Sequence, residues 1–216
     1  MPPQLTEHQN SVILSFLKAP RIGYVKTRLA RSIGSKLALD VYRKLVERQL
    51  SEVPPDYHNE IHFTPGDAFQ EMSDWLGKRY EFYPQCEGEL GMRLESAVFN
   101  AFKRGAKQVI CIGGDCPKLN RTYFEETTIA LQCGYDVVFG PSEDGGYYLI
   151  GLNAPCIQLF QNIPWSTEST LEVSLERSAA LNLSVKLLDT LYDVDEVSEL
   201  NRAVRDGILE IQPSQK

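Results

Sequence analysis

Four aspartates carry the strongest chemical signal in the 216-residue sequence, namely Asp115, Asp144, Asp193 and Asp195. Asp115 comes shortly after the apolar run 109–112, which predicts a buried strand. A carboxylate there stands at the carboxyl edge of a parallel sheet, where ligands of such folds bind. Mg²⁺ and Mn²⁺ prefer one or two protein carboxylates together with phosphate oxygens. Asp115 is therefore predicted to bind Mg²⁺ or Mn²⁺; the alternative is an aspartate that caps the next helix.

The glycines that precede Asp115 and the acids near the carboxyl terminus extend this prediction. Gly113 and Gly114 are expected to let a phosphate approach the backbone, because they carry no Cβ atom. Asp193 and Asp195 follow another predicted strand, and alternate side chains of an extended backbone point the same way. Both acids are thus candidates for the same cation, the alternative being an N-cap of a helix that begins near Glu196.

Asp144 opens a third motif, in which it is followed by Gly145, Gly146 and Tyr147. The glycines lead into the apolar strand predicted at 147–152, so Asp144 is expected beside aromatic rings at the start of that strand. A carboxylate, a bare backbone and an aromatic face together suit a polyhydroxylated substrate. The alternative is a simple hairpin turn.

Residues 18–31 form a basic loop without a single acid, between the first predicted strand and the first long helix. Its cations are Lys18, Arg21, Lys26, Arg28 and Arg31. Doubly wound folds hold phosphate at this position, so the loop predicts an anionic ligand. It matches neither a Walker loop nor a G-x-G-x-x-G fingerprint, which weighs against kinases and dehydrogenases. A solvated basic surface is the alternative.

Composition excludes several other classes of function. The chain has 22 Lys and Arg against 29 Asp and Glu, a net charge of -7 that disfavours nucleic acid as a partner. Its three histidines (His8, His58 and His62) lie outside the four motifs, which weighs against Ser-His-Asp hydrolases and His-ligated zinc. Residues 1–10 lack the apolar run of a signal peptide, and no membrane span of roughly 18 apolar residues occurs, so a cytoplasmic location is expected.

Apolar runs and helical periods alternate along the whole chain. Strands are predicted at 11–17, 60–64, 80–83, 109–112, 136–139, 147–152 and 185–188. Helices are predicted from 35 to the Pro54-Pro55 pair, at 67–76, 87–104, 122–132 and 168–180, and from 197. This alternation predicts an α/β fold with three layers, in which helices cover both faces of an open, mostly parallel sheet. One domain over 1–216 is expected, with a disordered tail from about 212.

Six ordered motifs extend the interpretation to a family. They are Lys18-Ala-Pro with Gly23-Tyr-Val-Lys-Thr-Arg-Leu29, Gln85-Cys-Glu-Gly-Glu-Leu-Gly-Met-Arg93, Gly114-Asp-Cys-Pro117, Asp144-Gly-Gly-Tyr-Tyr-Leu-Ile-Gly151, Ile163-Pro-Trp-Ser-Thr167 and Asp193-Val-Asp195. With them the chain resembles, over nearly its whole length, a bacterial family of the nucleotide-diphospho-sugar transferase superfamily (the GT-A fold) whose members are described as glycosyltransferases associated with arsenosugar biosynthesis.

The resemblance implies roles for individual residues. Asp115 would be the superfamily's metal-binding carboxylate, faced by Asp195 with Asp193 nearby, while Lys26 and Arg28 would contact phosphates. Many GT-A enzymes carry Asp-x-Asp at the metal, whereas Cys116 and a proline follow Asp115 here. That form is closer to nucleotidylyltransferases of the molybdopterin-cofactor and phospholactate kinds.

Two further motifs enter only through the resemblance. Glu89 and Arg93 are expected to bind substrate, although their i and i+4 spacing equally suits a surface ion pair. Trp165, Ser166 and Thr167 are expected to line the acceptor pocket, the alternative being a core tryptophan followed by a helix cap.

The resulting expectation is a metal-dependent transferase that moves a glycosyl group from a nucleotide sugar to a small-molecule acceptor. The metal ion bound by Asp115 would stabilise the leaving diphosphate, and Asp144 would position or deprotonate the acceptor hydroxyl. Nucleotidylyl transfer from an NTP, with release of pyrophosphate, is the first alternative. A nucleotide-sugar sensor without turnover is the second. A homodimer is one expected assembly, and the sequence does not name the base, the sugar or the acceptor.

Overall fold

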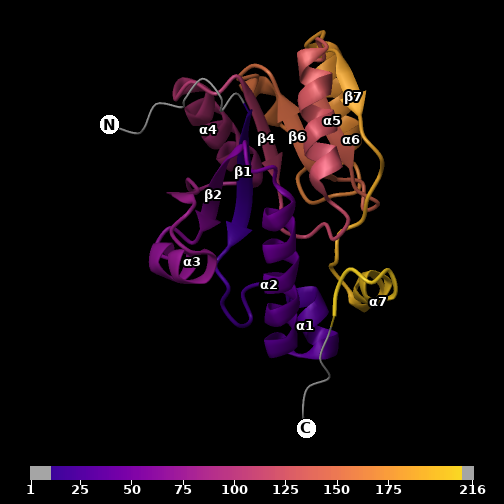
Figure 1. The fold of residues 1–216 in the computed structure, drawn as a ribbon. Coiled ribbons are helices and arrows are strands. Elements are labelled where there is room, and N and C mark those ends of the chain that lie inside the picture. The colour runs from indigo at the N-terminus through magenta and orange to yellow at the C-terminus, as the bar shows by residue number, and fades with distance from the viewer. Residues whose placement is uncertain (1–10, 211–216) are drawn as a thin grey trace.

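The computed structural model describes residues 11–210 and has a seven-stranded sheet at its centre (Figure 1). The strands are β1 (Ser11–Lys18), β2 (His58–Thr64), β3 (Glu81–Pro84), β4 (Gln108–Ile112), β5 (Val137–Pro141), β6 (Tyr147–Leu152) and β7 (Val185–Leu187). The helices are α1 (Thr27–Ile33), α2 (Ser35–Glu52), α3 (Phe69–Leu76), α4 (Leu90–Lys103), α5 (Arg121–Gln132), the short 3₁₀-helix η1 (Ile157–Phe160), α6 (Thr170–Ala180) and α7 (Val197–Arg205).

The strand order is β3-β2-β1-β4-β6-β5-β7, and only β6 runs against the other strands of the described chain. The turn from β5 to β6 is too short for a crossover, so the two strands pair as an antiparallel hairpin. β6 also pairs antiparallel with β4, and the four remaining neighbouring pairs are parallel. The predicted mostly parallel α/β sheet is confirmed.

Helices cover both faces of the sheet, as the near-continuous apolar runs of the strands require. Val12 and Leu14 of β1 belong to the core on the side of α4, η1 and α6. On the opposite side, Ile13 packs in the core with α5, and Leu17 packs with α2 and α3. Because successive side chains of a strand alternate between faces, β1 is buried from both sides.

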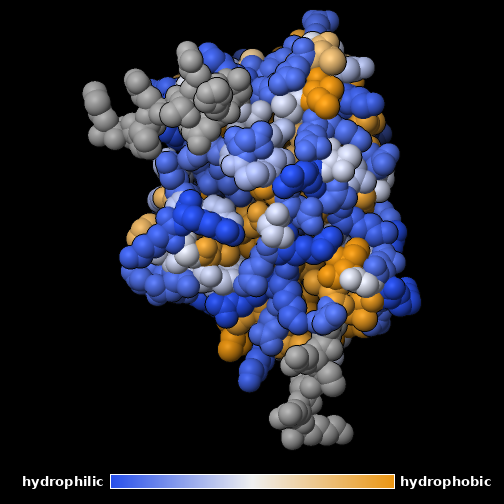
Figure 2. Space-filling view, viewed as in Figure 1, coloured by the Kyte–Doolittle hydropathy of each residue, from blue (hydrophilic) through white to orange (hydrophobic). Residues whose placement is uncertain are grey.

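A fourth core lies beyond the carboxyl edge of the sheet, between α1, α2 and α7. Figure 1 shows α1 and α7 at the lower end of the molecule, and Figure 2 shows hydrophobic residues gathered around α7. The sequence predicted a loop up to Gly34, so α1 is a difference. Its seven residues bury only Leu29, and Lys26 at its N-cap makes no side-chain capping bond. The sequence therefore shows neither the helical period nor the capping residue by which a helix is predicted.

The segment before α7 connects the exits of two strands at the carboxyl edge. The Val194 amide donates to the carbonyl of Asp115 after β4 at 3.0 Å. The Leu191 amide donates to the carbonyl of Pro141 at the end of β5, also at 3.0 Å. Chain segments that are distant in sequence thereby meet at one rim, and this rim carries the predicted acids.

The remaining predicted strands and helices are present with shifts of up to three residues at their ends. Within residues 11–210, none of the helices combines the length and apolar character that crossing a membrane would need. The predictions on residues 1–10 and on the tail from 212 lie outside the described residues.

Candidate functional site

Three charged side chains from distant parts of the chain meet at the carboxyl edge, and we call them the cleft cluster: Lys26, Asp115 and Asp195. The Lys26 Nζ lies 2.6 Å from the Asp115 Oδ1 and 3.2 Å from the Asp195 Oδ1. Arg28 approaches the other Asp195 oxygen, Oδ2, at 2.7 Å. The predicted meeting of the two aspartates around one positive charge is therefore present, and that charge is a lysine ammonium.

Lys26 is held in place by its backbone as well as by its partners. It adopts a left-handed conformation (φ 48°) at the N-cap of α1, which is uncommon for a residue with a Cβ atom. The side chain is only 4% exposed. Burial alone lowers the pKa of an ammonium group, but the charges of Asp115 and Asp195 outweigh it and raise the pKa of Lys26 above its usual value.

Asp193 lies beside the cleft cluster and accepts a hydrogen bond from the Ser142 hydroxyl at 2.7 Å. The pKa of this carboxyl group is raised to about 7, first by burial and then by the negative charge of Asp115, while the Ser142 bond and the charge of Lys26 act in the lowering direction. Burial and the neighbouring Asp115 charge thus both disfavour the ionised form of Asp193.

The helix-cap alternatives for these acids are wrong. Asn120 caps α5, because its side-chain oxygen accepts a hydrogen bond from the Thr122 amide, so Asp115 is not the cap of that helix. Glu196 caps α7 through a reciprocal pair of bonds with Glu199.

Gln49 of α2 fixes the turn that presents Asp115, and sequence reasoning missed it. Its amide donates to the Gly113 carbonyl and its oxygen accepts the Cys116 amide, both at 3.2 Å. The available signal was a glutamine on the buried face of α2, where an unpaired polar group would be costly. Gly114 also differs from the prediction: a Cβ atom there would meet Leu17 at 2.9 Å, so this glycine serves core packing, whereas a Cβ at Gly113 meets only open space.

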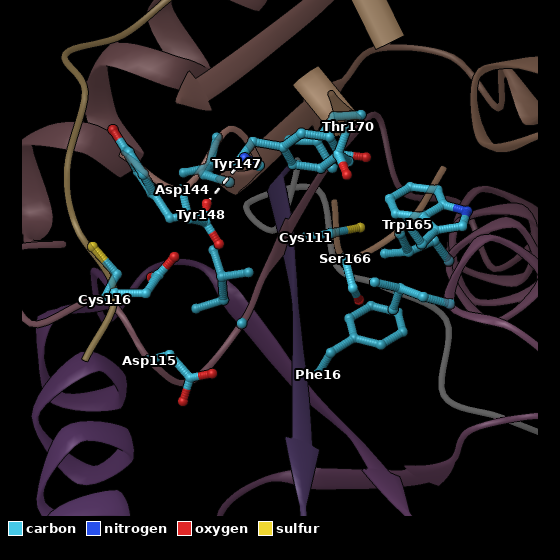
Figure 3. Close-up of a pocket in the computed structure, with 18 of the residues that line it drawn as sticks. Phe16, Cys111, Asp115, Cys116, Asp144, Tyr147, Tyr148, Trp165, Ser166 and Thr170 are labelled. Atoms are coloured by element: carbon cyan, nitrogen blue, oxygen red, sulfur yellow. Dashed lines mark hydrogen bonds between the residues drawn. The ribbon is translucent and has the colours of Figure 1, made fainter. Parts of the chain in front are cut away.

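A cleft of about 270 Å³ opens next to Asp115, between the sheet and α4. It is lined by Phe16, Gln49, Leu90, Leu94, Cys111, Ile112, Gly113, Asp115, Cys116, Asp144, Gly146, Tyr147, Tyr148, Leu149, Ile150, Trp165, Ser166, Thr167, Thr170 and Asp193. Figure 3 shows Asp115 and Asp144 on one side of this space, and Phe16, Ser166 and Trp165 on the other. The cleft has an acidic side and an aromatic side.

Asp144 lies in the turn between β5 and β6, and it lines the cleft. Its Oδ1 accepts the Gly146 amide at 2.9 Å. Gly145 has φ +84°, and a Cβ atom on it would lie 2.0 Å from the Glu168 carbonyl oxygen. Gly145 therefore permits close packing against the segment before α6. The hairpin turn considered from the sequence is present, and the same turn presents a carboxylate to the cleft.

The segment 165–167 also borders the cleft. The Trp165 ring lies edge-on to the Tyr147 ring, with centroids 6.1 Å apart. Ser166 has a left-handed backbone (φ 62°), and the Thr167 hydroxyl donates to the Pro164 carbonyl at 2.8 Å. This tight turn directs Trp165 and its neighbours towards the space that Asp144 faces.

Other predicted site residues lie away from the cleft wall. Arg21 forms ion pairs with Asp67 and Glu71 of the α3 region, so it fastens the basic loop to the fold. Lys18 is exposed at the end of β1. Glu89 is exposed at the N-cap of α4.

Arg93 also lies outside the cleft wall. It binds the Gly88 carbonyl at 2.8 Å and the Gln85 side chain at 3.3 Å, and among the described residues the structure records no ion pair between it and Glu89. The side chain therefore braces the loop before α4.

A second charged group, which we call the β2 cluster, consists of Glu60, His62 and Arg104. The Arg104 Nη2 lies 2.6 and 2.5 Å from the two Glu60 oxygens, and the His62 Nε2 lies 3.0 Å from Glu60. Burial favours the neutral acid, but the bonds and charges of His62 and Arg104 prevail and lower the pKa of Glu60. The alternation of polar residues along β2 was the sequence signal.

His58 and Glu81 border the β2 cluster, and with Glu60 they have ligand atoms within 4.8 Å of one another, a spacing that a metal ion could use. This group lies towards the start of β2, away from the carboxyl edge. Arg104 already neutralises Glu60, so the ion pair accounts for its charge.

Comparison with known proteins places the chain in a family. The chain matches the family model described as "Uncharacterized protein conserved in bacteria (DUF2064)" over residues 53–167, more than half of its length. A structure from Desulfovibrio desulfuricans G20, described as a "putative nucleotide-diphospho-sugar transferase", is similar over 92% of this chain and 88% of that chain, with 33% sequence identity and a TM-score of 0.87. None of the curated proteins matches the chain.

More distant structures share the fold alone. CMP:2-keto-3-deoxy-manno-octonic acid synthetase in complex with CTP has a TM-score of 0.59 and 13% identity, covering 93% of this chain and 100% of that chain. Rv0371C of Mycobacterium tuberculosis H37Rv in complex with manganese has a TM-score of 0.54 and 11% identity, covering 90% and 97%. The family model and the similar structure at 33% identity agree with the sheet described above: the chain belongs to the DUF2064 family and to the nucleotide-diphospho-sugar transferase superfamily.

Proposed function

We propose that the protein is a divalent-metal-dependent glycosyltransferase that uses a nucleotide-diphosphate sugar and a small hydroxyl acceptor. The observation that carries this proposal is the convergence of Asp115 and Asp195 on one positive charge at the carboxyl edge, directly beside the cleft. The link to arsenosugar biosynthesis stays a prediction.

The donor atoms of the site fit Mg²⁺ or Mn²⁺, because hard cations prefer carboxylate oxygens and phosphates. Asp115 and Asp195 already share the Lys26 ammonium, and their side chains are 44% and 34% exposed, so solvent and ligands reach them. Asp193 adds a third carboxyl group at the cleft wall. A divalent ion bound between Asp115 and Asp195 would neutralise the charge that develops on the leaving diphosphate.

The basic side chains supply the remaining positive charge for the diphosphate. When phosphates arrive, Lys26 can exchange a carboxylate for a phosphate oxygen while its ammonium stays paired. Arg28 is 63% exposed and points at Asp195 from the solvent side, where a phosphate can replace or share its partner.

Asp144 acts on the acceptor, at the other end of the bond that is transferred. It accepts the proton of the acceptor hydroxyl, the hydroxyl oxygen forms a bond to the anomeric carbon, and the bond from that carbon to the diphosphate breaks. The nucleoside diphosphate leaves with the bonding electron pair. The Gly146 amide orients the Asp144 carboxylate for this role.

Nucleotidylyl transfer is the second candidate function. The buried Lys26 favours it, because a fixed ammonium next to two carboxylates suits an α-phosphate under attack. The cleft wall favours glycosyl transfer, since a phosphorylated co-substrate would meet Asp144 and Asp193 there.

Thermal unfolding with a panel of nucleoside diphosphates, nucleotide sugars and NTPs tests the proposal. With Mn²⁺, a nucleotide sugar at about 100 times its dissociation constant should stabilise the protein by about 2.7 kcal/mol, and chelation should remove the effect. Product analysis with pooled acceptors then separates the functions. Release of nucleoside diphosphate supports glycosyl transfer, release of pyrophosphate from an NTP supports nucleotidylyl transfer, and binding without any product supports a sensor.

A further inference from the structure

The aromatic side of the cleft is built from four separate segments. Phe16 comes from β1, Tyr147 from β6, and Leu90 and Leu94 from α4. Trp165 closes this side from the turn before α6, and Figure 3 shows it across the space from Asp144. The surface is apolar although it opens to solvent, which is the usual sign of a ligand-binding wall.

Close packing fixes this wall in advance. A Cβ atom on Gly91 of α4 would lie 2.5 Å from the Trp165 Nε1, so the absence of a side chain lets the indole ring pack against the helix. Tyr147 is packed between Trp165 and Phe139, with ring centroids 6.1 and 5.1 Å away. A rigid aromatic surface loses little conformational entropy when a flat group lies against it.

Charge and size restrict what this space accepts. Its wall includes Asp115, Asp144 and Asp193, and no lysine, arginine or histidine of residues 11–210 belongs to the lining. An acceptor that carries phosphate or carboxylate would therefore face like charges. The volume of about 270 Å³ lies below the range of about 300–1,000 Å³ typical of drug-sized ligands, so one compact group fits.

We propose that the acceptor is an uncharged hydroxyl compound with a compact aromatic or otherwise apolar body, which lies between Phe16 and Trp165 while its hydroxyl reaches Asp144. This inference rests on the proposed glycosyl transfer and names its acceptor class. The hydroxyl proton passes to Asp144, and the oxygen becomes the glycosidic oxygen of the product. The donor's diphosphate stays at the cleft cluster, outside the aromatic wall.

Tryptophan fluorescence measures this binding directly, because Trp75 and Trp165 are the two tryptophans of the chain. In a Trp75→Phe variant, 2-phenylethanol should change the Trp165 emission with saturation. Glycerol should leave the emission unchanged, and phenyl phosphate should bind at least about tenfold more weakly because of the carboxylates. If Trp75→Phe folds poorly, the Trp165 signal is obtained by subtracting the emission change of Trp165→Phe from that of the wild type.

Two exposed apolar side chains of α4 provide a matched pair of variants. Leu90 and Met92 are 39% and 59% exposed, and only Leu90 lines the cleft. Leu90→Gln should weaken 2-phenylethanol binding by about tenfold, the usual effect of losing one buried aliphatic contact. Met92→Gln should leave it unchanged.

Competition with the donor separates this proposal from the glycosyltransferase proposal itself. A nucleoside diphosphate with Mn²⁺ should bind without displacing 2-phenylethanol, since the two occupy different sides of the cleft. Displacement would assign the aromatic wall to the base and overturn the inference. Equal effects of Leu90→Gln and Met92→Gln, or equal binding of phenyl phosphate, would overturn it as well. The acceptor inference then fails while metal-dependent donor binding stands.

Discussion

The cleft cluster and the β2 cluster both set carboxylates against a mostly buried cation, but they differ in which partner is more enclosed: the carboxylate in the β2 cluster and the cation in the cleft cluster. Glu60 is 1% exposed, and Arg104 reaches in to hold both of its oxygens. In the cleft cluster Lys26 is the enclosed group at 4% exposure, while Asp115 and Asp195 remain 44% and 34% exposed.

This inversion predicts a structural ion pair in the β2 cluster and a site that exchanges partners in the cleft cluster. A carboxylate closed off from solvent keeps the one cation that folding gives it, and its loss is costly. Exposed carboxylates can bind a metal ion, and the fixed ammonium between them can bind a phosphate, without unfolding of the protein. The comparison predicts that mutations in the cleft cluster change binding and turnover, and that mutations in the β2 cluster change stability.

The largest expected effect is on turnover by Asp115→Asn. The amide removes the charge that is proposed to bind the metal ion, so kcat/KM should fall by about a thousandfold, the loss typical for a key electrostatic group. The midpoint of thermal unfolding should stay close to wild type, because the side chain is half-exposed. Asp189→Asn, a change at an exposed aspartate outside the site, serves as the control. Full activity of Asp115→Asn would remove the cleft cluster from the mechanism.

Arg104→Met should show the reverse pattern. It leaves the Glu60 charge buried without its main partner, which lowers the free energy of unfolding by about 3 kcal/mol. Activity per folded molecule should not change. Denaturant unfolding measures the loss, and the exposed Arg202 pair with Glu143 is the control, since Arg202→Met should have a far smaller effect. Addition of Glu60→Gln to Arg104→Met should recover part of the stability, because the unpaired charge is gone.

Lys26→Met tests whether the ammonium competes with the metal ion. Without Lys26, the Asp115 and Asp195 carboxylates lose their internal cation, and Mn²⁺ affinity should rise by about tenfold in the absence of nucleotide. Affinity for a nucleoside diphosphate should fall at the same time. Calorimetry with Mn²⁺ alone measures the first effect, with the exposed Lys36→Met as the control. Weaker Mn²⁺ binding in Lys26→Met would show that the carboxylates need the lysine to stay in place.

The sheet was predictable from the sequence because its central strands are apolar on both faces, whereas the partners within the site were not predictable. Asp115 and Asp195 could be named from their positions after strands. Lys26 was assigned to phosphate, and its pairing with residues about 90 and 170 positions away depends on how α1 turns the chain. α1 itself was missed, because a seven-residue helix with one buried side chain leaves no clear period.

Gln49 and the β2 cluster show a second limit of sequence reasoning. Gln49 falls on a helical face otherwise filled by apolar residues, and only the tertiary structure reveals the turn that it clamps. The polar alternation of β2 suggests a solvated face. Glu60 and His62 are instead buried, and Arg104 at the C-cap of α4 reaches Glu60. In both cases a polar residue is buried because its partner arrives from another element.

The smallest expected effect concerns pH and completes the comparison. The pKa of Glu60 is lowered in the folded protein, so its ionised form stabilises the fold above the usual carboxyl pKa of about 4.5. This contribution is lost as the pH falls from there through the lowered pKa, since the unfolded chain then binds the proton first. Glu60→Gln should therefore flatten the acid side of the stability profile, measured as the free energy of unfolding between about pH 6 and pH 3, while the exposed Glu126→Gln leaves the slope unchanged. An unchanged slope in Glu60→Gln would mean that the enclosed carboxylate contributes no more to acid stability than an exposed one, and the distinction between the two clusters would then rest on Arg104→Met alone.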